Sequence, residues 1–560
     1  MRGEQMLTNS RNGRRKRGST LVLFTLMLPT LLIPLVGLGI DATMLYIVQA
    51  KLSAATDGAA LGAGRLLGTL ADPQEIAGEF LRVNFPTNNT AGFWGAYNLV
   101  PTIVYTPGIT KTIKVNATAN VPLLFSRVFG QNNALVSALS VAVRNDTRVV
   151  LVLDRSTSMN TSDGAGSTVI ADAKAYASSF VQKFTEGSDE LGLVVFGGSA
   201  IVAYPPANAN STSSTISLTS TGGPNKTFWD GTANDIPHQI SNISAGSYTG
   251  TAEALSLAYV ELQKAHMRDF NTDGVDTRLN SIVLLTDGVP TAVTLYPNNG
   301  VLGSSDNVIK TTSSCTNKGT ASVSPTTKMI GWFANSPTLP FTVSGTNING
   351  LYQPASTDPT SARTSSWWMS NPNADYTTVS GIVPDPNPST PFAGCTGIKG
   401  SQSNLDSSTN SDLRAIPDHD AYGNLMTGTA YHNSHVTGGG AVTTIYTGTE
   451  LDQTKPTSEY HWGMAIFNGV DNAAYKIRTD ANLANRSGDT TGNMNIAIYA
   501  IGYTGNGGCD DGLLKRVAND KSAVGYDASQ RTGVYVSAND KVGLANAFNT
   551  VASSILRLAQ

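Results

Sequence analysis

The sequence predicts an α/β fold with a doubly wound, mostly parallel sheet that is flanked by helices. Three apolar runs, "VVLVL" (149–153), "LGLVV" (191–195) and "SIVLL" (281–285), are typical of strands buried on both faces. The Ala- and Leu-rich stretch "TAEALSLAYVELQKA" (251–265) indicates a helix between two of them. Strands that alternate with helices favour a doubly wound sheet, in which ligands bind at the carboxyl ends of the strands.

Length and composition predict several structural units and exclude one class of partner. The chain has 560 residues, whereas single cores stop growing near about 250–300 residues. Only 14% of the residues are charged, and 55 are glycines, which suits a surface protein with many loops. The net charge of -3 provides no basic field for a phosphate backbone, so we expect no binding of nucleic acid.

The N-terminus predicts a membrane anchor. A basic segment, "RNGRRKR" (11–17), precedes an uncharged apolar run from Ser19 to Ile40. As a helix this run would extend about 33 Å, which is enough to cross the hydrocarbon core. Since basic residues stay on the cytoplasmic side, residues 1–18 are expected inside, 19–40 across the membrane, and the rest in the periplasm or outside the cell. A cleaved signal peptide is the alternative interpretation.

The stretch after the span continues as an Ala-rich helix, predicted over 41–79. The segment "GSTLVLF…GLGIDATMLYIVQAKLSAATDGAALGAGR" resembles the N-terminal part of TadE/TadG-like proteins of tight-adherence (Flp) pilus systems. The resemblance rests on Gly18, Asp41, Gln49, Lys51 and the run "AATDGAALGAG". Pseudopilins are processed before a segment with a glutamate near its fifth position. Residues 19–40 contain none, which favours the larger, anchored members of the family.

Two further units follow. Residues 80–147 alternate β-branched and polar positions between Pro, Gly and Asn, which predicts a small strand-rich stalk. Residues 148–560 are assigned to the α/β domain. About 160 residues of polar, Ser- and Thr-rich composition separate its strands, so we interpret 290–455 as an insertion. Its tryptophans are expected in a small core of the insertion or, alternatively, at a contact surface; they are Trp332, Trp367 and Trp368.

The strand 149–153 ends in "DRSTS", where Asp154, Ser156 and Ser158 recur with period two. A loop at the strand end could direct these oxygen atoms to one point, and hard oxygen ligands suit Mg²⁺ or Mn²⁺. A helix cap with turn serines is the simpler alternative. A second apolar strand ends in Asp287, and Thr249 stands just before a helix, which strengthens the prediction of a metal site.

The order of these motifs resembles the von Willebrand factor type A domain. The resemblance implies a metal-ion-dependent adhesion site (MIDAS) formed by Asp154, Ser156, Ser158, Thr249 and Asp287. Thr249 is chosen over Thr251 because the family threonine stands six residues before the helix leucine, here Leu255. The implied ion is Mg²⁺, with Mn²⁺ or Ca²⁺ as alternatives. It leaves one coordination position for a carboxylate from a partner protein.

Two weaker patterns complete the site predictions. "DFNTDGVDTRLN" (269–280) starts like a calcium loop with Asp269, Asn271 and Asp273 but has Asn280 at the twelfth position, so a polar turn is predicted instead. Of the three cysteines, Cys315 and Cys395 share the insertion and are predicted to pair, leaving Cys509 free.

The sequence as a whole predicts a single-pass bacterial membrane protein that binds a protein partner through a metal. It would act in assembly of a tight-adherence pilus or in surface attachment, with pilus or envelope components as partners. An adhesin or sensor unrelated to pili is the alternative. An enzyme is not expected, because neither a G-x-S-x-G nucleophile motif with a His/Asp pair nor a phosphate-binding loop occurs.

Overall fold

The computed structural model divides the chain into two compact units, residues 1–144 with residue 560, and residues 145–559. It describes residues 22–28, 32–67, 72–87, 92–108, 110–198, 200–204, 228–229, 235–246, 248–273, 276, 278–295, 331–334, 416, 418–420, 422–427, 435–436, 442–443, 451–453, 459–480, 493–505 and 509–558.

The first unit packs a long helix on an antiparallel hairpin and a third strand. Helix α2 (Ile33–Gly64) begins beside Pro34 and continues past the predicted end of the membrane span. Helix α3 (Pro73–Asn84) is capped by Asp72, whose side chain accepts a hydrogen bond from Gln74 N. Strands β1 (Tyr97–Thr106), β2 (Thr110–Pro122) and β3 (Asn133–Asn145) form a sheet in that order, and β1 and β2 are antiparallel. The short 3-10 turns are η2 (Phe93–Gly95) and η3 (Ser126–Phe129).

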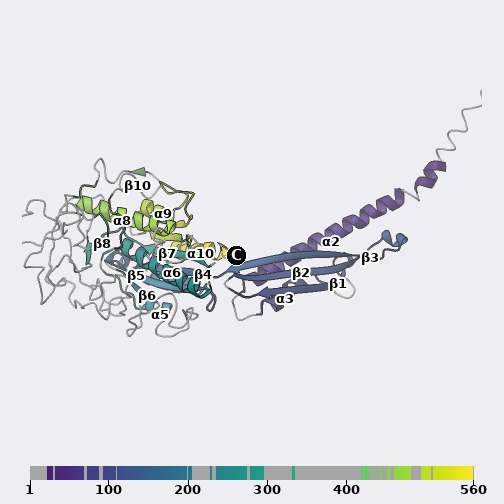
Figure 1. Ribbon diagram of the computed structural model, residues 1–560, viewed down its shortest axis with the longest axis horizontal. Coiled ribbons are helices and arrows are strands. Elements are labelled where there is room, and N and C mark those ends of the chain that lie inside the picture. The colour runs from purple at the N-terminus through teal and green to yellow at the C-terminus, as the bar shows by residue number, and fades with distance from the viewer. Residues whose placement is uncertain are drawn as a thin grey trace, which may run out of the picture. The chain divides into compact units, whose positions relative to one another are not determined.

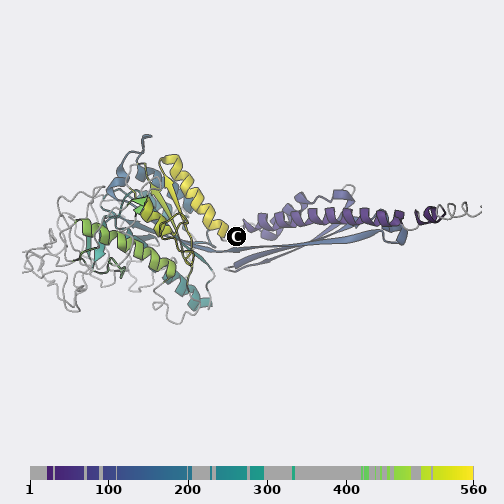
Figure 2. The same cartoon turned by 90° about the horizontal axis from the view of Figure 1, so that it is seen from above.

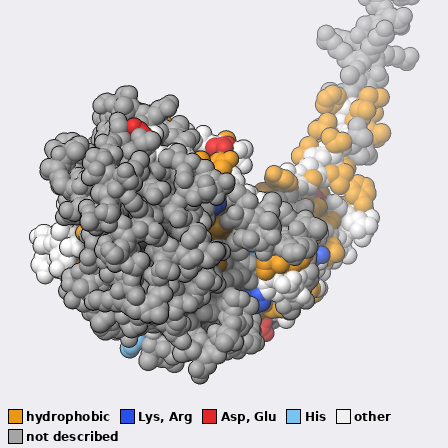
Figure 3. Space-filling view, turned by 60° about the vertical axis from the view of Figure 1, so that its left-hand side comes forward, with side chains coloured by type: hydrophobic (Ala, Val, Ile, Leu, Met, Phe, Trp, Pro, Cys, Tyr) orange, Lys and Arg blue, Asp and Glu red, His pale blue; other side chains and the backbone are white. Residues whose placement is uncertain are grey.

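Helix α2 has two parts with different surroundings. From Met44 onward, its small and apolar side chains pack into one core with α3 and with the inward-facing positions of β2 and β3. Before Asp41, its apolar side chains are exposed, and Figure 3 shows them gathered along this part of the molecule. Among the described residues, α2 is the helix long and apolar enough to cross a membrane. The N-terminal apolar helix is therefore the candidate membrane anchor.

The second unit confirms the predicted fold class. Its six-stranded sheet has the order β13-β12-β7-β4-β5-β6. The bounds are β4 (Thr147–Asp154), β5 (Glu190–Phe196), β6 (Ala200–Tyr204), β7 (Leu279–Thr286), β12 (Ala497–Tyr503) and β13 (Val534–Ala538). Neighbouring strands are parallel except the edge pair β5 and β6.

Helices cover both faces of this sheet (Figure 1, Figure 2). Alternate residues of β4 enter opposite cores, with Val149 and Leu151 on one face and Val150 and Val152 on the other. The first face is covered by α4 (Val169–Val181), α5 (Ile236–Ser241) and α10 (Lys541–Leu558). The second is covered by α6 (Thr251–Asp273), α8 (Glu459–Thr479) and α9 (Asp511–Ala518). A 3-10 turn, η4 (Thr157–Asn160), follows β4.

Part of the predicted insertion packs on the α6 and α8 face. Residues 422–427 lie there, because Asn424 donates to Ser256 Oγ at 2.9 Å and Met426 O accepts from Asn468 Nδ2 at 3.0 Å. Four short strands also fall in 290–455: β8 (Ala292–Leu295) pairs with β9 (Gly331–Ala334), and β10 (His435–Val436) pairs with β11 (Val442–Thr443). Trp367, Trp368, Cys315 and Cys395 lie outside the described residues, as does the side chain of Trp332. Cys509 is a free thiol.

The polar turn predicted for 269–280 begins later than expected, because helix α6 continues to Asp273 and strand β7 begins at Leu279. The reason is a buried ion cluster at the amino-terminal ends of β4, β5 and β7. Arg148 is fully buried and contacts Glu190 at 2.8 Å, Asp269 at 2.6 Å and Asp276 at 2.7 Å. Asp269 therefore stabilises the last turns of α6 through arginine. We call these residues, with Arg268 and Arg278, the basal ion cluster.

Candidate metal site at the strand ends

The predicted site residues lie at the carboxyl ends of two neighbouring parallel strands. Asp154 is the last residue of β4, and Asp287 directly follows β7, which pairs with β4. Ser156 and Ser158 lie in the turn after β4, and Thr249 precedes α6 by two residues. Asp154 and Asp287 are fully buried, and Ser156 and Thr249 are nearly so. The strands β5 and β7 lie on opposite sides of β4, so this is a switch point of the kind where such sheets bind ligands.

Asp154 is held by the turn that follows it. Its Oδ1 accepts a hydrogen bond from Ser156 N at 2.6 Å, and its Oδ2 accepts one from the Thr286 hydroxyl. The turn itself is fixed to the sheet, because Arg155 N donates to Phe196 O at 2.8 Å. The carboxylate therefore has a defined position at the end of β4.

The two serines connect the turn to Asp287. Ser156 Oγ and Ser158 Oγ lie 3.0 Å apart. Asp287 Oδ1 accepts from Ser158 Oγ at 2.7 Å and lies 3.4 Å from Ser156 Oγ. The period-two spacing of the "DRSTS" motif thus places both hydroxyls on the same carboxylate oxygen.

The Thr249 hydroxyl also lies near Gly288, as the two serine hydroxyls do. A methyl group added at Gly288 would lie 3.4 Å from Ser158 Oγ and from Thr249 Oγ1, and 4.0 Å from Ser156 Oγ. The Thr249 backbone is fixed, since its carbonyl accepts from Thr291 N at 2.9 Å and from Ala292 N at 3.1 Å. Thr251 is the first residue of α6, and its buried Oγ1 has no hydrogen-bond partner among the described residues. The structure thus brings Thr249 to the two serines.

The electrostatics of the site come from two buried carboxylates. Burial, and then the charge of Asp287, raise the pKa of Asp154 to about 7, although hydrogen bonds from Thr286 and Ser156 act in the opposite direction. A buried carboxylate pair disfavours full ionisation unless a cation lies beside it. A divalent cation would supply that charge.

The donor set fits Mg²⁺, which is typically bound through one or two carboxylates with water at further positions. Among the described residues, no group of three or more His, Cys, Asp and Glu side chains could hold a metal. This site differs because three hydroxyls, from Ser156, Ser158 and Thr249, accompany two carboxylates. Asp154 and Asp287 would provide the charge, and the hydroxyls would serve as neutral oxygen ligands.

Two residues of the site were missed from the sequence. Thr286 donates to Asp154 and also accepts from Gly288 N at 3.3 Å, so it links the ends of β4 and β7. Gly288 leaves the space on which the three hydroxyls converge. The sequence signal for both residues was the tripeptide "TDG" (286–288) at the end of β7. Only its aspartate was included in the predicted site.

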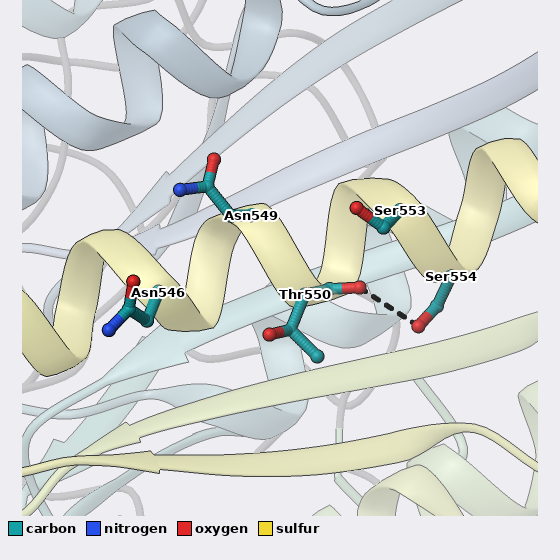
Figure 4. A pocket seen from close by; sticks show the side chains of 5 residues that line it. All are labelled: Asn546, Asn549, Thr550, Ser553 and Ser554. Atoms are coloured by element: carbon teal, nitrogen blue, oxygen red, sulfur yellow. Dashed lines mark hydrogen bonds between the residues drawn. The ribbon is translucent and has the colours of Figure 1, made fainter.

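A hollow of about 450 Å³ lies elsewhere in this unit (Figure 4). Its described lining comes from α10 alone and is uncharged: Asn546, Asn549, Thr550, Ser553 and Ser554. Ser554 Oγ donates to Thr550 O at 2.9 Å, an ordinary bond within a helix. These residues offer no carboxylate for a cation.

Comparison with known families agrees with the fold and with the order of the motifs. Residues 149–289 match the model of the von Willebrand factor type A domain, so the α/β unit contains such a domain. Residues 18–66 match the model described as putative Flp pilus-assembly TadE/G-like. The two matches together account for both resemblances predicted from the sequence.

Comparison with solved structures found distant resemblances. The PilB minor pilin from Streptococcus sanguinis is 14% identical, with coverage of 84% of this chain and 81% of that chain and a TM-score of 0.33. The vWF domain of the type V pili tip protein Mfa5 from Porphyromonas gingivalis is 14% identical, with coverage of 75% and 98% and a TM-score of 0.28. BatB, a conserved hypothetical protein from Bacteroides thetaiotaomicron, is 21% identical, with coverage of 25% and 54% and a TM-score of 0.17. The comparison with curated proteins found no match.

Proposed function

We propose that this protein is a membrane-anchored binding module whose von Willebrand factor type A domain holds Mg²⁺, or alternatively Mn²⁺ or Ca²⁺, and captures a partner protein through that ion. The setting that the TadE/G-like segment favours is assembly of a tight-adherence pilus or surface attachment. The apolar helix before Asp41 is the anchor, with the N-terminus cytoplasmic and the larger unit outside the membrane.

One observation carries this proposal. Two fully buried carboxylates, Asp154 and Asp287, face three hydroxyls at a sheet switch point. Such buried charge is costly unless it is paired or binds a metal. A cation supplies the missing charge, and an ion held by few protein charges retains affinity for one more oxygen ligand. A carboxylate of a partner protein would then complete the coordination.

We infer a binding role from the kinds of group that the described residues bring to this site. The described groups around Asp154 are carboxylates, hydroxyls and backbone amides, each engaged with another member of the site. A bound cation at this position would act as a bridge between proteins. Partners supplying a carboxylate are therefore expected among pilus or envelope components.

The decisive experiment is capture of partners from bacterial membranes by the full chain, with Mg²⁺ or with EDTA. The variant Asp154→Ala removes a charged ligand that serine and threonine cannot replace. We expect it to lose metal-dependent partners and to keep its circular dichroism spectrum, since Asp154 is the last residue of β4 and is not part of the two apolar cores of the sheet. Asp527→Ala is the control, because its carboxylate caps a local turn, where it accepts hydrogen bonds from Ser529 and Gln530. Equal capture by both variants would refute the metal-dependent function.

A further inference from the structure

The turn between β2 and β3 is fastened to the outer end of the apolar helix. We call residues 123–130 the β2–β3 loop. The Asp41 carboxylate on α2 accepts hydrogen bonds from Leu124 N at 2.9 Å, from Phe125 N at 3.1 Å and from Ser126 N and Oγ, both at 2.7 Å. Asp41 is only 2% exposed. The loop is thus clamped at the residue where the apolar run ends.

Phe125 extends this contact toward the membrane side of Asp41. A methyl group added at Gly37 would lie 2.5 Å from Phe125 Cγ, so the ring packs directly on the helix backbone. Gly37 precedes Asp41 by four residues, which is about 6 Å along a helix. It belongs to the apolar run 19–40. The β2–β3 loop therefore lies beside the last turn of the predicted span.

The free surface of the loop is apolar at this level. Leu124, Val128 and Phe129 are 57%, 83% and 61% exposed. The neighbouring helix exposes apolar side chains as well, so the two surfaces are continuous; these side chains are Leu35, Val36, Leu38 and Ile40. Arg127, also exposed, adds a cation among them. An apolar tip with a basic residue is the composition of a segment that enters a membrane interface.

Backbone amides of the β2–β3 loop form hydrogen bonds within the protein, as an environment poor in water requires. The amides of residues 124–126 are used by Asp41. Val128 N donates to Phe125 O at 3.1 Å, Gly130 N to Arg127 O at 3.0 Å, and Gln131 N to Ser126 O at 3.1 Å. Irregular backbone is tolerated near hydrocarbon only when its polar groups are satisfied internally.

We propose that the β2–β3 loop is a second membrane contact, with Leu124, Val128 and Phe129 inserted among the lipids of the outer leaflet. This inference rests on the membrane anchor of the proposed function and is independent of its metal site. The occupant is a lipid surface because the exposed apolar face is continuous with that of the anchoring helix. Arg127 then meets the lipid phosphates, and the first unit is held to the membrane at two points.

The test uses the full chain in nanodiscs of phosphatidylcholine and phosphatidylglycerol, with its three cysteines replaced by serine. A single cysteine at Val128 carries an environment-sensitive dye. Leu139→Cys is the matched control, since Leu139 is an apolar residue 56% exposed. Its neighbour Ser140 bonds Thr56 at 3.0 Å, fifteen residues beyond Asp41 and about 22 Å further along the helix.

We expect doxyl-labelled lipid to quench the dye at position 128 severalfold more than the dye at 139, and iodide in solution to show the reverse order. Adding Asp41→Ala should release the loop and raise iodide quenching at 128. Equal iodide quenching at the two positions would overturn the proposal, and protection from both quenchers would assign the surface to a second copy. A chain that does not enter nanodiscs refutes the anchor itself, whereas loss of Mg²⁺-dependent capture alone leaves the loop result unchanged.

Discussion

Strands β4 and β7 carry charged groups at both of their ends, and the two ends are built in opposite ways. At the amino-terminal end, Arg148 is the centre of the basal ion cluster, in which three arginines face three carboxylates: Arg148, Arg268 and Arg278 against Glu190, Asp269 and Asp276. At the carboxyl end, Asp154 and Asp287 face hydroxyls and each other. One end pairs its charges within the chain, whereas at the other end the proposed cation would supply the opposite charge.

The pKa values of the carboxyl groups at the two ends shift in opposite directions. Burial opposes ionisation of Glu190, yet Arg148, Arg278 and Arg268 hold its pKa below the usual range. Burial also opposes ionisation of Asp276, whose pKa is lowered by His266 and Arg148. Asp154 has the contrary shift, upward. Burial acts on all three carboxylates, and the direction of each pKa shift follows the neighbouring charges: arginines beside Glu190 and Asp276, and a second carboxylate beside Asp154.

The largest effect is expected at the basal ion cluster. Arg148→Met leaves buried carboxylates without their shared cation, so the free energy of unfolding should fall by about 3–5 kcal/mol. Denaturant titration would measure this. Lys183→Met, at an exposed position, is the control and should change stability little. If Arg148→Met were as stable as the control, the cluster would contribute no compensation and the comparison would fail.

A second effect is expected from the ion at the other end. Mg²⁺ that binds only the folded domain stabilises it by about 2.7 kcal/mol at a concentration one hundred times its dissociation constant. The wild type should therefore melt at a higher temperature in Mg²⁺, and Asp154→Asn should lose this rise while it keeps the fold. Calorimetry in Mg²⁺ and in EDTA checks the prediction. A similar Mg²⁺ response in the variant would place the ion elsewhere.

The opposite shifts also predict the pH dependence of the metal-free protein. Glu190 and Asp276 have lowered folded-state pKa values, so their stabilisation is present above the unfolded pKa near 4 and is lost as pH falls. Asp154 is raised to about 7, so its stabilisation is present below pH 4 and is lost as pH rises toward 7. The metal-free protein should therefore lose stability on the alkaline side as the pH rises from about 4 to about 7.

Unfolding measured from pH 3 to pH 8 in EDTA should thus show a maximum between the two ranges. Asp154→Asn should flatten the alkaline decline, and Asp276→Asn should reduce the acid decline. Should both variants keep the wild-type profile, the two ends of the strands would not differ in the way described.

The smallest effect separates two threonines that the sequence alone could not distinguish by residue type. Thr249→Val removes a hydroxyl from the converging set and should weaken Mg²⁺ binding about tenfold, or about 1.4 kcal/mol. Thr251→Val removes a buried hydroxyl that has no partner in the part of the chain that the structure describes, so Mg²⁺ binding should not change and stability should stay equal or rise slightly. Isothermal titration of both variants measures the difference. The reverse order of effects would contradict the choice of Thr249.

The sequence alone predicted that the side chains at the carboxyl ends of β4 and β7 lie close together, because the signals for this arrangement are local. "DRSTS" and "TDG" stand directly after apolar runs, and parallel strands bring such ends to one edge. The position of Thr249 needed the family pattern, since nothing local separates it from Thr251. Thr286 was missed because its contact with Asp154 joins residues far apart in the sequence.

The basal ion cluster at the amino-terminal ends of β4 and β7 could not be predicted in the same way. Arg148 precedes five apolar residues and has the composition of a strand entrance, but its partners come from β5, α6 and the approach to β7. The polar turn predicted from Asp269 onward did not anticipate the last turn of α6, in which Asp269 pairs with Arg148 from β4. Asp41 was likewise noticed only as part of a resemblance, since its donors lie more than 80 residues away in the sequence.

The Asp41 clamp has a mechanical consequence for the first unit. A helix that contacts a sheet only through apolar side chains can slide along its own axis when one end is pulled. Here, a shift of α2 by one turn would leave a buried carboxylate without its donors and would drive the Phe125 ring into the side chains that flank Gly37. Axial load on the helix would therefore be transferred through Asp41 to the loop between β2 and β3.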